Sequence, residues 1–505
     1  MEVAMASDGQ VIHADAILAG GSLAGLVAAA VLSRQGYRVI VLEETGHLGS
    51  RVGGTQVDGY WIDWGHRDGH GVGDIAFAPV FTRRAAEAVG ISAPLRPFVG
   101  SCLRVHWLPD QRVTELPMES VVGTSADPVQ QVRSLCTCFG VAPDRLEQVT
   151  KSILDAMMQL VGISDEEAHA LIPARLADWL VRNVSEPEAR RVILQQNELV
   201  PLGPNESLGR YITHLKTFAG EAGAVVIDHE RVGGVQGIVT AFADVVKDNG
   251  GQILLNMKPL EVMVGDHEVQ GVIALDESSL VHEFRAPIVI TDYEGWRLPE
   301  FVDPDLLPAG FVEAASDLRQ YSVALPSWWA GLSRLPRRRS DGEVEDHASP
   351  WQRIFRGRAD VKHAYGGWFF TSAFSRNSAP PGKHLLTFWL ETFSESGKPG
   401  WRSWADARAD LDVAIDYLHQ YYADLDECVE WSRYQYKTPP SWLSWYLKPA
   451  YRHPVKVSTI DGFYVASATA ETKGSFLDIE CAVGLEAAEL AQQERGHLVS
   501  DAHGH

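Results

Sequence analysis

Short apolar runs separated by glycine turns open the chain. Residues 14–19 and 38–42 each form an apolar run of strand length, and residues 26–35 between them carry an apolar helical pattern. Gly36 follows this helix at the position where a left-handed cap is favoured. The pattern therefore predicts a strand–helix–strand unit at the start of the chain.

The same alternation of helix and strand returns later in the sequence. Apolar helical patterns over residues 235–246 and 479–493 lie next to further runs of strand length. These runs lie at residues 252–256, 269–275, 287–291 and 462–466. Strands that alternate with helices are typical of a parallel sheet. An α/β fold assembled from distant segments is therefore expected.

Two intervening regions have other patterns. Residues 127–215 are helical in character, because apolar side chains recur there at four-residue steps. Residues 309–451 are mixed and aromatic, and they contain ten of the fifteen tryptophans. Within them, residues 333–350 carry a run of three arginines followed by acidic residues, which favours an exposed loop with a solvated basic turn.

Length and charge limit the classes of protein. A chain of 505 residues with 45% hydrophobic residues is long enough for two or more domains. The net charge of -22 argues against a nucleic-acid partner and against a broadly basic membrane-docking face. Peripheral contact with a membrane through a small apolar patch remains compatible with this charge.

The termini and cysteines indicate the compartment. The first ten residues lack the basic and apolar regions of a secretory signal, and residues 16–33, although uncharged, contain the glycines of a strand–turn–helix. The five cysteines are an odd number without a metal-binding or redox spacing, so reduced thiols are expected. A cytoplasmic protein with no transmembrane span and no metal site is therefore predicted.

One glycine-rich turn carries the clearest chemistry. Glycines at its ends allow a tight strand-to-helix turn and close approach of the backbone to a pyrophosphate, which the helix N-terminus attracts. An acid at the end of the next strand, either Glu43 or Glu44, can accept hydrogen bonds from ribose hydroxyls. The expected dinucleotide contacts in the turn are Gly20, Ser22, Leu23, Ala24 and Gly25.

Further blocks, in order along the chain, resemble the phytoene desaturase, retinol saturase and amine oxidase group of flavoproteins. Leu48-Gly49-Ser50-Arg51 is similar to the family's Gly-Gly-Arg element, and residues 58–65 are similar to its flavin-lining block. Residues 464–468 and 484–488 resemble its last flavin-contacting strand and helix. The segment at 378–384, with Pro-Pro-Gly-Lys-His, is similar to the phytoene desaturase-like branch.

The resemblance implies FAD and a discontinuous architecture. A Rossmann-type FAD-binding domain would comprise residues 1–75, 225–305 and 452–505, with an inserted mixed α+β substrate domain at 76–224 and 306–451. The implied additional FAD contacts are Gly49, Ser50, Arg51, Asp63, Trp64, Gly65, Leu260, Ser467 and Ala468.

The sequence departs from the family pattern at three places. Ser22 replaces the middle glycine, Ser467-Ala468 replaces the usual Gly-Asp or Gly-Ala, and His66 stands where proline is common. These changes leave open a weakened cofactor site or a reshaped pocket.

The resemblance also implies a reaction. In the desaturase-like branch, flavin N5 exchanges a hydride with a C–H bond of an isoprenoid or polyene, in desaturation, saturation or isomerisation. Aromatic side chains suit such a hydrophobic small-molecule substrate. The candidate pocket walls are Trp328, Trp329, Trp368 and Trp389. No second dinucleotide fingerprint is visible, so oxygen or a quinone is the expected electron acceptor.

The polar cluster His66-Arg67-Asp68-Gly69-His70 follows the flavin-lining block. His66 or His70 could act as general acid or base, with Asp68 orienting one of them. Metal binding by the two histidines and a purely structural loop are the other interpretations. At the level of the whole protein, a flavin amine oxidase and a non-catalytic binding protein with a degenerate FAD site remain the alternatives.

Overall fold

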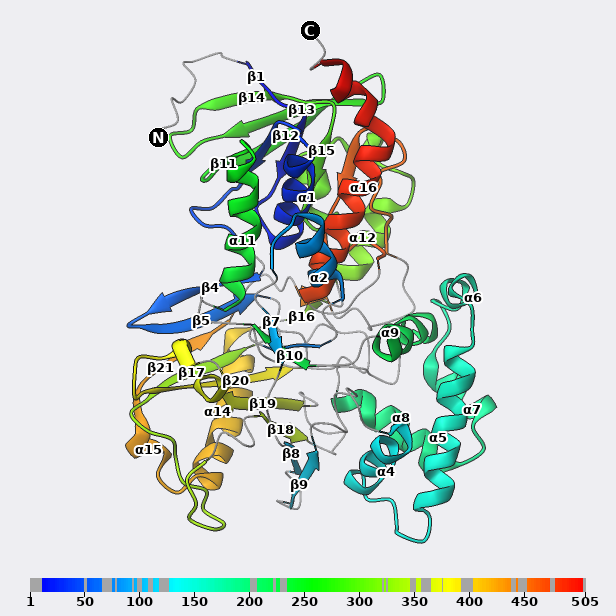
Figure 1. The fold of residues 1–505 in the computed structure, drawn as a ribbon, viewed down its shortest axis with the longest axis vertical. Helices are drawn as coiled ribbons and strands as arrows, with labels where there is room; N and C mark the ends of the chain where they lie inside the picture. Colours follow the sequence, from blue (N-terminus) through cyan, green and yellow to red (C-terminus); the bar gives the residue numbers. More distant parts are fainter. Residues whose placement is uncertain are drawn as a thin grey trace.

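The computed structural model describes residues 11–49, 52–65, 75–77, 80–92, 95–97, 102–107, 112–117, 127–199, 207–220, 224–227, 234–319, 322–323, 326–345, 351–355, 365–374, 376–391, 403–436, 442–443, 452–472 and 477–502. Figure 1 shows a layered part that contains the first and last elements, a second sheet below it, and a group of helices beside that sheet. No helix among the described residues is both long and apolar enough to cross a bilayer.

A five-stranded parallel sheet is the centre of the layered part. Its strands run in the order β11-β3-β2-β15-β23, and every neighbouring pair is parallel. They are β2 (Ala16–Ala19), β3 (Val39–Leu42), β11 (Gln252–Leu254), β15 (Val289–Thr291) and β23 (Phe463–Val465). The four strands other than β11 are buried throughout, because both faces of the sheet are covered. The Rossmann-type α/β fold expected from the sequence is confirmed.

Helices cover one face of this sheet and an antiparallel sheet covers the other (Figure 1). Leu18 and Ile290 face the helices, whereas their neighbours Ile17 and Val289 face the antiparallel sheet, as the two-residue period of a strand requires. The helices are α1 (Leu23–Arg34), α11 (Val235–Asp248) and α16 (Leu477–Ala502). The covering strands are β1 (Val11–His13), β12 (Lys258–Gly265), β13 (Glu268–Leu275) and β14 (Val281–Arg285).

The strands of the parallel sheet come from widely separated parts of the chain. They all fall within the three segments expected for the FAD-binding domain, at 1–75, 225–305 and 452–505. The exact domain boundaries stay a prediction.

A group of helices forms a separate apolar core. They are α4 (Pro128–Cys138), α5 (Leu146–Val161), α6 (Asp165–Ala170), α7 (Leu176–Asn183), α8 (Pro187–Leu199) and α9 (Leu208–Gly220). Their inward residues include Val149, Ile153 and Leu180, which are at most 1% exposed. The helical pattern expected for residues 127–215 is therefore confirmed.

A seven-stranded sheet occupies the aromatic region, in the order β21-β17-β20-β19-β18-β8-β9. Its strands are β8 (Cys102–Trp107), β9 (Arg112–Pro117), β17 (Ser327–Leu332), β18 (Trp351–Phe355), β19 (Tyr365–Phe370), β20 (His384–Glu391) and β21 (Val429–Gln435). One face packs against α14 (Trp404–Tyr421) and α15 (Leu425–Cys428). The sequence indicated only a mixed region here, because the strands pair across long separations that local patterns do not reveal.

Shorter elements join these parts. The hairpin of β4 (Val52–Val57) and β5 (Tyr60–Gly65) lies between the layered part and the seven-stranded sheet (Figure 1). Asp58 and Gly59, both at positive φ, form its turn. The remaining described elements include α2 (Val80–Ala88), α12 (Phe311–Arg319), α13 (Thr371–Phe374), β6 (Ile75–Phe77), β7 (Leu95–Pro97), β10 (Ala224–Ile227), β16 (Ser322–Val323) and β22 (Trp442–Leu443).

Most described residues of the segment 333–345 are exposed, as expected for the loop at 333–350, but the basic run in it is not simply solvated. Glu345 is fully buried and binds the guanidinium of Arg104 at 2.7 Å and that of Arg338 at 3.3 Å. Arg339 donates to the carbonyls of His419, Gln420 and Tyr422 at the end of α14. The basic run is thus a structural clamp, because Arg338 binds a buried carboxylate in the same segment and Arg339 binds helix carbonyls about 80 residues away in sequence.

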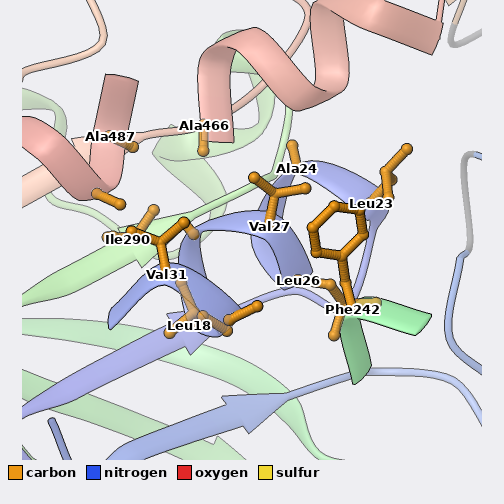
Figure 2. Close-up of a cluster of buried hydrophobic side chains, with 14 of the residues drawn as sticks. Leu18, Leu23, Ala24, Leu26, Val27, Val31, Phe242, Ile290, Ala466 and Ala487 are labelled. Atoms are coloured by element: carbon orange, nitrogen blue, oxygen red, sulfur yellow. The ribbon is translucent and has the colours of Figure 1, made fainter. Parts of the chain in front are cut away.

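α1 and α16 pack closely enough to require a glycine. Figure 2 shows apolar side chains of α1, among them Ala24 and Val27, in one cluster with Ala466, which follows β23, and Ala487 of α16. A Cβ at Gly484 of α16 would lie 2.5 Å from the carbonyl oxygen of Ala24 and 3.0 Å from Cβ of Val27. This contact holds the start of α1 against the C-terminal helix.

We predict that Gly484→Ala lowers the unfolding free energy by about 1–3 kcal/mol, because the added methyl group overpacks this contact. Alanine favours a helix over glycine by about 1 kcal/mol, so a net loss of unfolding free energy would have to come from the crowded contact between α1 and α16. Thermal unfolding followed by circular dichroism measures it. The control is Gly162→Ala, where the nearest atom would be 3.4 Å away and a change within about 0.5 kcal/mol is expected. Equal midpoints for both variants would contradict the prediction.

Candidate cofactor-binding site

The glycine turn joins β2 to α1, as the sequence predicted. Gly20 has a φ of +125°, which favours glycine, and its N–H donates to the carbonyl of Leu42 at 2.9 Å. A Cβ at Gly25 would lie 2.7 Å from the Gly20 carbonyl oxygen. The turn therefore needs glycine at both ends, for backbone conformation at one and for close packing at the other.

Glu43, rather than Glu44, faces this turn. The buried carboxylate of Glu43 accepts from the Gly21 N–H at 2.8 Å through one oxygen, and from the N–H and hydroxyl of Thr45 at 2.9 and 2.7 Å through the other. A carboxylate offers about four acceptor positions, so Glu43 retains capacity for a ribose hydroxyl.

Glu44 points elsewhere and pairs with Arg297 at 3.4 Å. The Arg297 guanidinium also lies 4.2 Å from the centre of the Tyr293 ring. Burial, followed by the carboxylates of Glu44 and Asp292, raises the pKa of the Tyr293 phenol. Tyr293 therefore stays protonated as part of a cation–aromatic cluster beside the sheet end.

An acid that the sequence analysis missed stands at the N-terminus of α1. The carboxylate of Asp292 accepts from the Ser22 N–H at 2.7 Å. A Cβ at Gly20 would lie 1.7 Å from the Asp292 Oδ1 atom, so this carboxylate fills the space above the glycine. The available signal was its position, directly after the apolar run at 287–291, because β15 lies beside β2 and parallel strands end at the same edge.

The side-chain hydroxyl of Ser22 is a second polar group at the N-terminus of α1, beside the Asp292 carboxylate. Ser22 is the N-cap residue of α1, yet its side chain makes no capping hydrogen bond. Its hydroxyl oxygen is buried and has no hydrogen-bond partner among the described residues. Buried hydroxyls are normally satisfied, which indicates that a group absent from the polypeptide completes this turn.

The remaining residues of the turn and the following loop lie close to Ser22. Leu23, Ala24 and Gly25 form the buried first turn of α1. Gly49, at a φ of +80°, donates its N–H to the Gly21 carbonyl at 2.9 Å. The loop after β3 is thereby held against the glycine turn.

Other expected contacts lie around the same sheet. Leu260 is on β12 and is 36% exposed. Ser467 and Ala468 follow β23 and are buried. The Ser467 hydroxyl contacts the hydroxyl of Thr469, which accepts from the Gly295 N–H at 3.0 Å. The bend after β23 is thus tied to the segment that follows β15.

Several predicted residues are described only in part or not at all. His66, Asp68 and His70 lie outside the described residues, as do Ser50 and Arg51. The backbones of Asp63, Trp64 and Gly65 pair with Gly54, Gly53 and Val52 in the β4–β5 hairpin. Their assigned roles stay predictions.

The four tryptophans divide between the two faces of the seven-stranded sheet. Trp328 and Trp368 lie in the core beneath α14, where the Trp368 indole donates to the Tyr422 hydroxyl at 3.0 Å. Trp329 is on the opposite face, packed with Tyr60 and Ile62 of the hairpin region. Trp389 also lies on that face, in the buried cluster that contains Ala468.

A glycine turn, a facing acid and a Rossmann-type sheet, joined to a second large sheet, are features of dinucleotide-binding oxidoreductases. Over residues 23–475 the sequence matches the family described as flavin containing amine oxidoreductase, and the chain belongs to this family. FAD, expected from the resemblance, is the cofactor that membership implies.

Solved structures share the fold. An oxidoreductase from Methanosarcina mazei has a TM-score of 0.66 at 15% identity, over 94% of this chain and 100% of that chain. Cyclohexylamine oxidase from Brevibacterium oxydans IH-35A has a TM-score of 0.60 at 16% identity, over 95% and 99%. Putrescine oxidase bound to putrescine has a TM-score of 0.60 at 14% identity, over 97% and 100%. A comparison with the curated proteins finds no significant match.

The residues at the turn fit FAD, provided that one side chain moves. Glu43 can hold the ribose, and the Ser22 hydroxyl and the N-terminus of α1 can hold the pyrophosphate. Asp292, however, places a carboxylate where an anionic pyrophosphate would accept from the same N–H. The cofactor and Asp292 therefore compete for the N-terminus of α1.

We predict that Asp292→Asn raises the affinity for FAD about tenfold, equivalent to about 1.4 kcal/mol, because it removes the competing charge and keeps the shape. Flavin fluorescence during titration of the apoprotein with FAD measures the Kd. A matched control is Asp276→Asn, which changes a carboxylate in the turn between β13 and β14 that binds His282 at 2.9 Å and should leave the Kd for FAD unchanged. An unchanged or higher Kd for Asp292→Asn would show that the carboxylate does not oppose the cofactor.

Proposed function

We propose that this FAD-dependent oxidoreductase acts on C–H or C–C bonds of a hydrophobic isoprenoid or polyene-like substrate. The supporting observation is that Trp389 and Phe369 belong to the same buried apolar cluster as Ala468, an expected flavin contact. Their rings are tilted at 48° with centroids 5.3 Å apart. An apolar wall beside the expected flavin position suits a substrate without charge near its reacting carbon.

Other side chains on the same face of the sheet as Trp389 are also buried and apolar. Trp329 and Leu385 are at most 3% exposed, and they pack with Ile62 of the hairpin. Thr387 lies between them and Trp389 on β20, and its hydroxyl contacts that of Thr371 at 3.1 Å. Among the side chains of β17, β19 and β20 that the structure describes, those on this face are Ser327, Trp329, Phe369, Leu385, Thr387 and Trp389, and none of these six is charged.

When bound, the flavin supplies a two-electron acceptor or donor for a hydride. The protein would bind and orient the substrate through Trp329 and Trp389 and exclude water from the reacting carbon. We assign proton transfer to His66 or His70, with Asp68 orienting one of them, as the sequence suggested. The substrate-binding part would comprise residues 76–224 and 306–451, with oxygen or a quinone as the electron acceptor.

A flavin amine oxidase is the second candidate, favoured by the family description and by the fold shared with cyclohexylamine oxidase. An amine would be recognised as a cation, which calls for a carboxylate or an aromatic cage. The aromatic rings of the sheet face could form such a cage. Substrate tests must therefore include amines.

The test uses the purified protein loaded with FAD, with flavin absorbance followed anaerobically. We expect all-trans-retinol, a polyene, to bleach the oxidised flavin with a saturable rate, and cyclohexylamine to leave it oxidised. Bleaching by cyclohexylamine with release of peroxide in air would instead establish the amine oxidase. A protein that takes up no FAD would support the non-catalytic alternative.

A variant tests the wall itself. We predict that Trp389→Leu weakens substrate binding about tenfold, because the lost ring area removes about 1.4 kcal/mol of apolar contact. The concentration of half-maximal bleaching measures this change. The control is Trp404→Phe, at a position on α14 that is 38% exposed on the far side of the sheet. Equal shifts in the two variants would contradict the assignment of Trp389.

A further inference from the structure

Three segments meet beside Glu43, the acid expected to hold the ribose of the dinucleotide. The N–H of Met257, just before β12, donates to the carbonyl of Glu43 at 2.8 Å. On β12 itself, the N–H of Val262 donates to the carbonyl of Phe301 at 2.8 Å. Phe301 ends a 3₁₀ helix at Gly295–Glu300, which follows β15. The end of β3, the strand β12 and this 3₁₀ helix therefore lie together at the ribose end of the site.

Arg297 connects the 3₁₀ helix to the end of β3. Its guanidinium pairs with Glu44 at 3.4 Å and with Glu300 at 3.2 Å. The guanidinium also lies over the ring of Tyr293, with Cζ 4.2 Å from the ring centre. Because Glu44 is the chain neighbour of Glu43, and consecutive Cα atoms are about 3.8 Å apart, Arg297 lies within reach of a base attached to a ribose at Glu43.

The stack of Arg297 on Tyr293 is built into the fold. Tyr293 is buried, and its ring packs against that of Phe301 with centroids 5.1 Å apart. The Arg297 side chain is 28% exposed, so it remains partly accessible to a ligand. Burial alone would lower the pKa of Arg297, but the carboxylates of Glu44 and Glu300 raise it overall. The guanidinium is thus charged and already matched by carboxylates, which favours a flat neutral ring over an anion as its ligand.

A bulge in β12 lies next to the same place. Pro259 pairs with Ala274 and Glu261 pairs with Ile273, so Leu260 has no residue opposite it in the pairing of β12 with β13. Leu260 is exposed, and it lies between the two positions at which this segment is tied to Glu43 and to Phe301. An exposed apolar side chain here would gain from contact with a ring.

We infer that the adenine ring of FAD stacks on the Arg297 guanidinium, on the side away from Tyr293. The ribose joins the base to the pyrophosphate, so a ribose at Glu43 and a pyrophosphate at the N-terminus of α1 leave the base on the Glu44 side. Adenine is flat and uncharged, and guanidinium groups stack on such rings. The inference concerns the cofactor that family membership implies, and it does not depend on the substrate proposed above.

The test is calorimetric titration of the full-length apoprotein with ADP and with UDP, which share the ribose and the pyrophosphate but differ in the base. We expect ADP to bind about tenfold more tightly, because a purine presents a larger face for stacking. Arg297→Lys keeps the charge but removes the planar group, so the ratio of the two affinities should fall about fivefold. Equal affinities in the unaltered protein, or an unchanged ratio in Arg297→Lys, would overturn the inference. Because the ratio is measured, a uniform loss of binding cannot imitate the expected result.

Two further variants separate stacking from charge pairing. Glu44→Gln removes the ion pair but leaves the guanidinium over Tyr293, so the ratio should stay within about twofold of its original value. The matched control is Arg408→Lys on α14, where the guanidinium lies 3.8 Å from the centre of the Tyr434 ring and pairs with Asp412 at 2.7 Å. That variant should leave the ratio constant. A larger fall of the ratio in Glu44→Gln than in Arg297→Lys would assign the effect to charge pairing and overturn the stacking.

Discussion

The positive N-terminal end of α1 is the constraint on which the layered part of the protein depends. The end of this helix meets β2, β3 and β15 at one edge of the sheet, and each neighbour contributes to it. Gly20 allows the turn, Glu43 binds its backbone, and Asp292 supplies a negative charge. Unpaired N–H groups and a helix dipole require such a charge. The polypeptide meets this requirement itself, and so competes with the dinucleotide that the same geometry suits.

The bend after β23 links the proposed substrate wall to the layered part. Ala468 belongs to the apolar cluster that contains Trp389, and its carbonyl accepts from the Arg452 guanidinium. One residue further on, the Thr469 hydroxyl accepts from the N–H of Gly295, which follows β15. A change at this bend would therefore be felt both by the apolar wall and by the end of the parallel sheet.

Local patterns in the sequence were sufficient for the layered fold and for part of the site. The apolar strands, the glycine turn and the acid after β3 are readable because each lies within one short segment. Asp292 was missed because its role depends on β15 lying beside β2, some 270 residues away in sequence. The contacts of Glu345 with Arg104 and of Arg339 with the end of α14 were missed for a similar reason, since a charged run is interpreted as solvated until its distant partners are known. Trp328 and Trp329 point to opposite faces of the sheet, and which face each takes became clear only from the pairing of β17 with β20.

The close contact between Gly484 and Ala24 has a consequence for the order of biosynthesis. A ribosome makes the glycine turn more than 400 residues before the helix that packs on it and the strand that completes the sheet edge, which come from residues 463–491. Until those residues emerge, the apolar surface of α1 is exposed and the turn lacks its neighbours. The cofactor site is therefore incomplete until those residues have been made, and protection of α1 by a chaperone would be most needed in that interval.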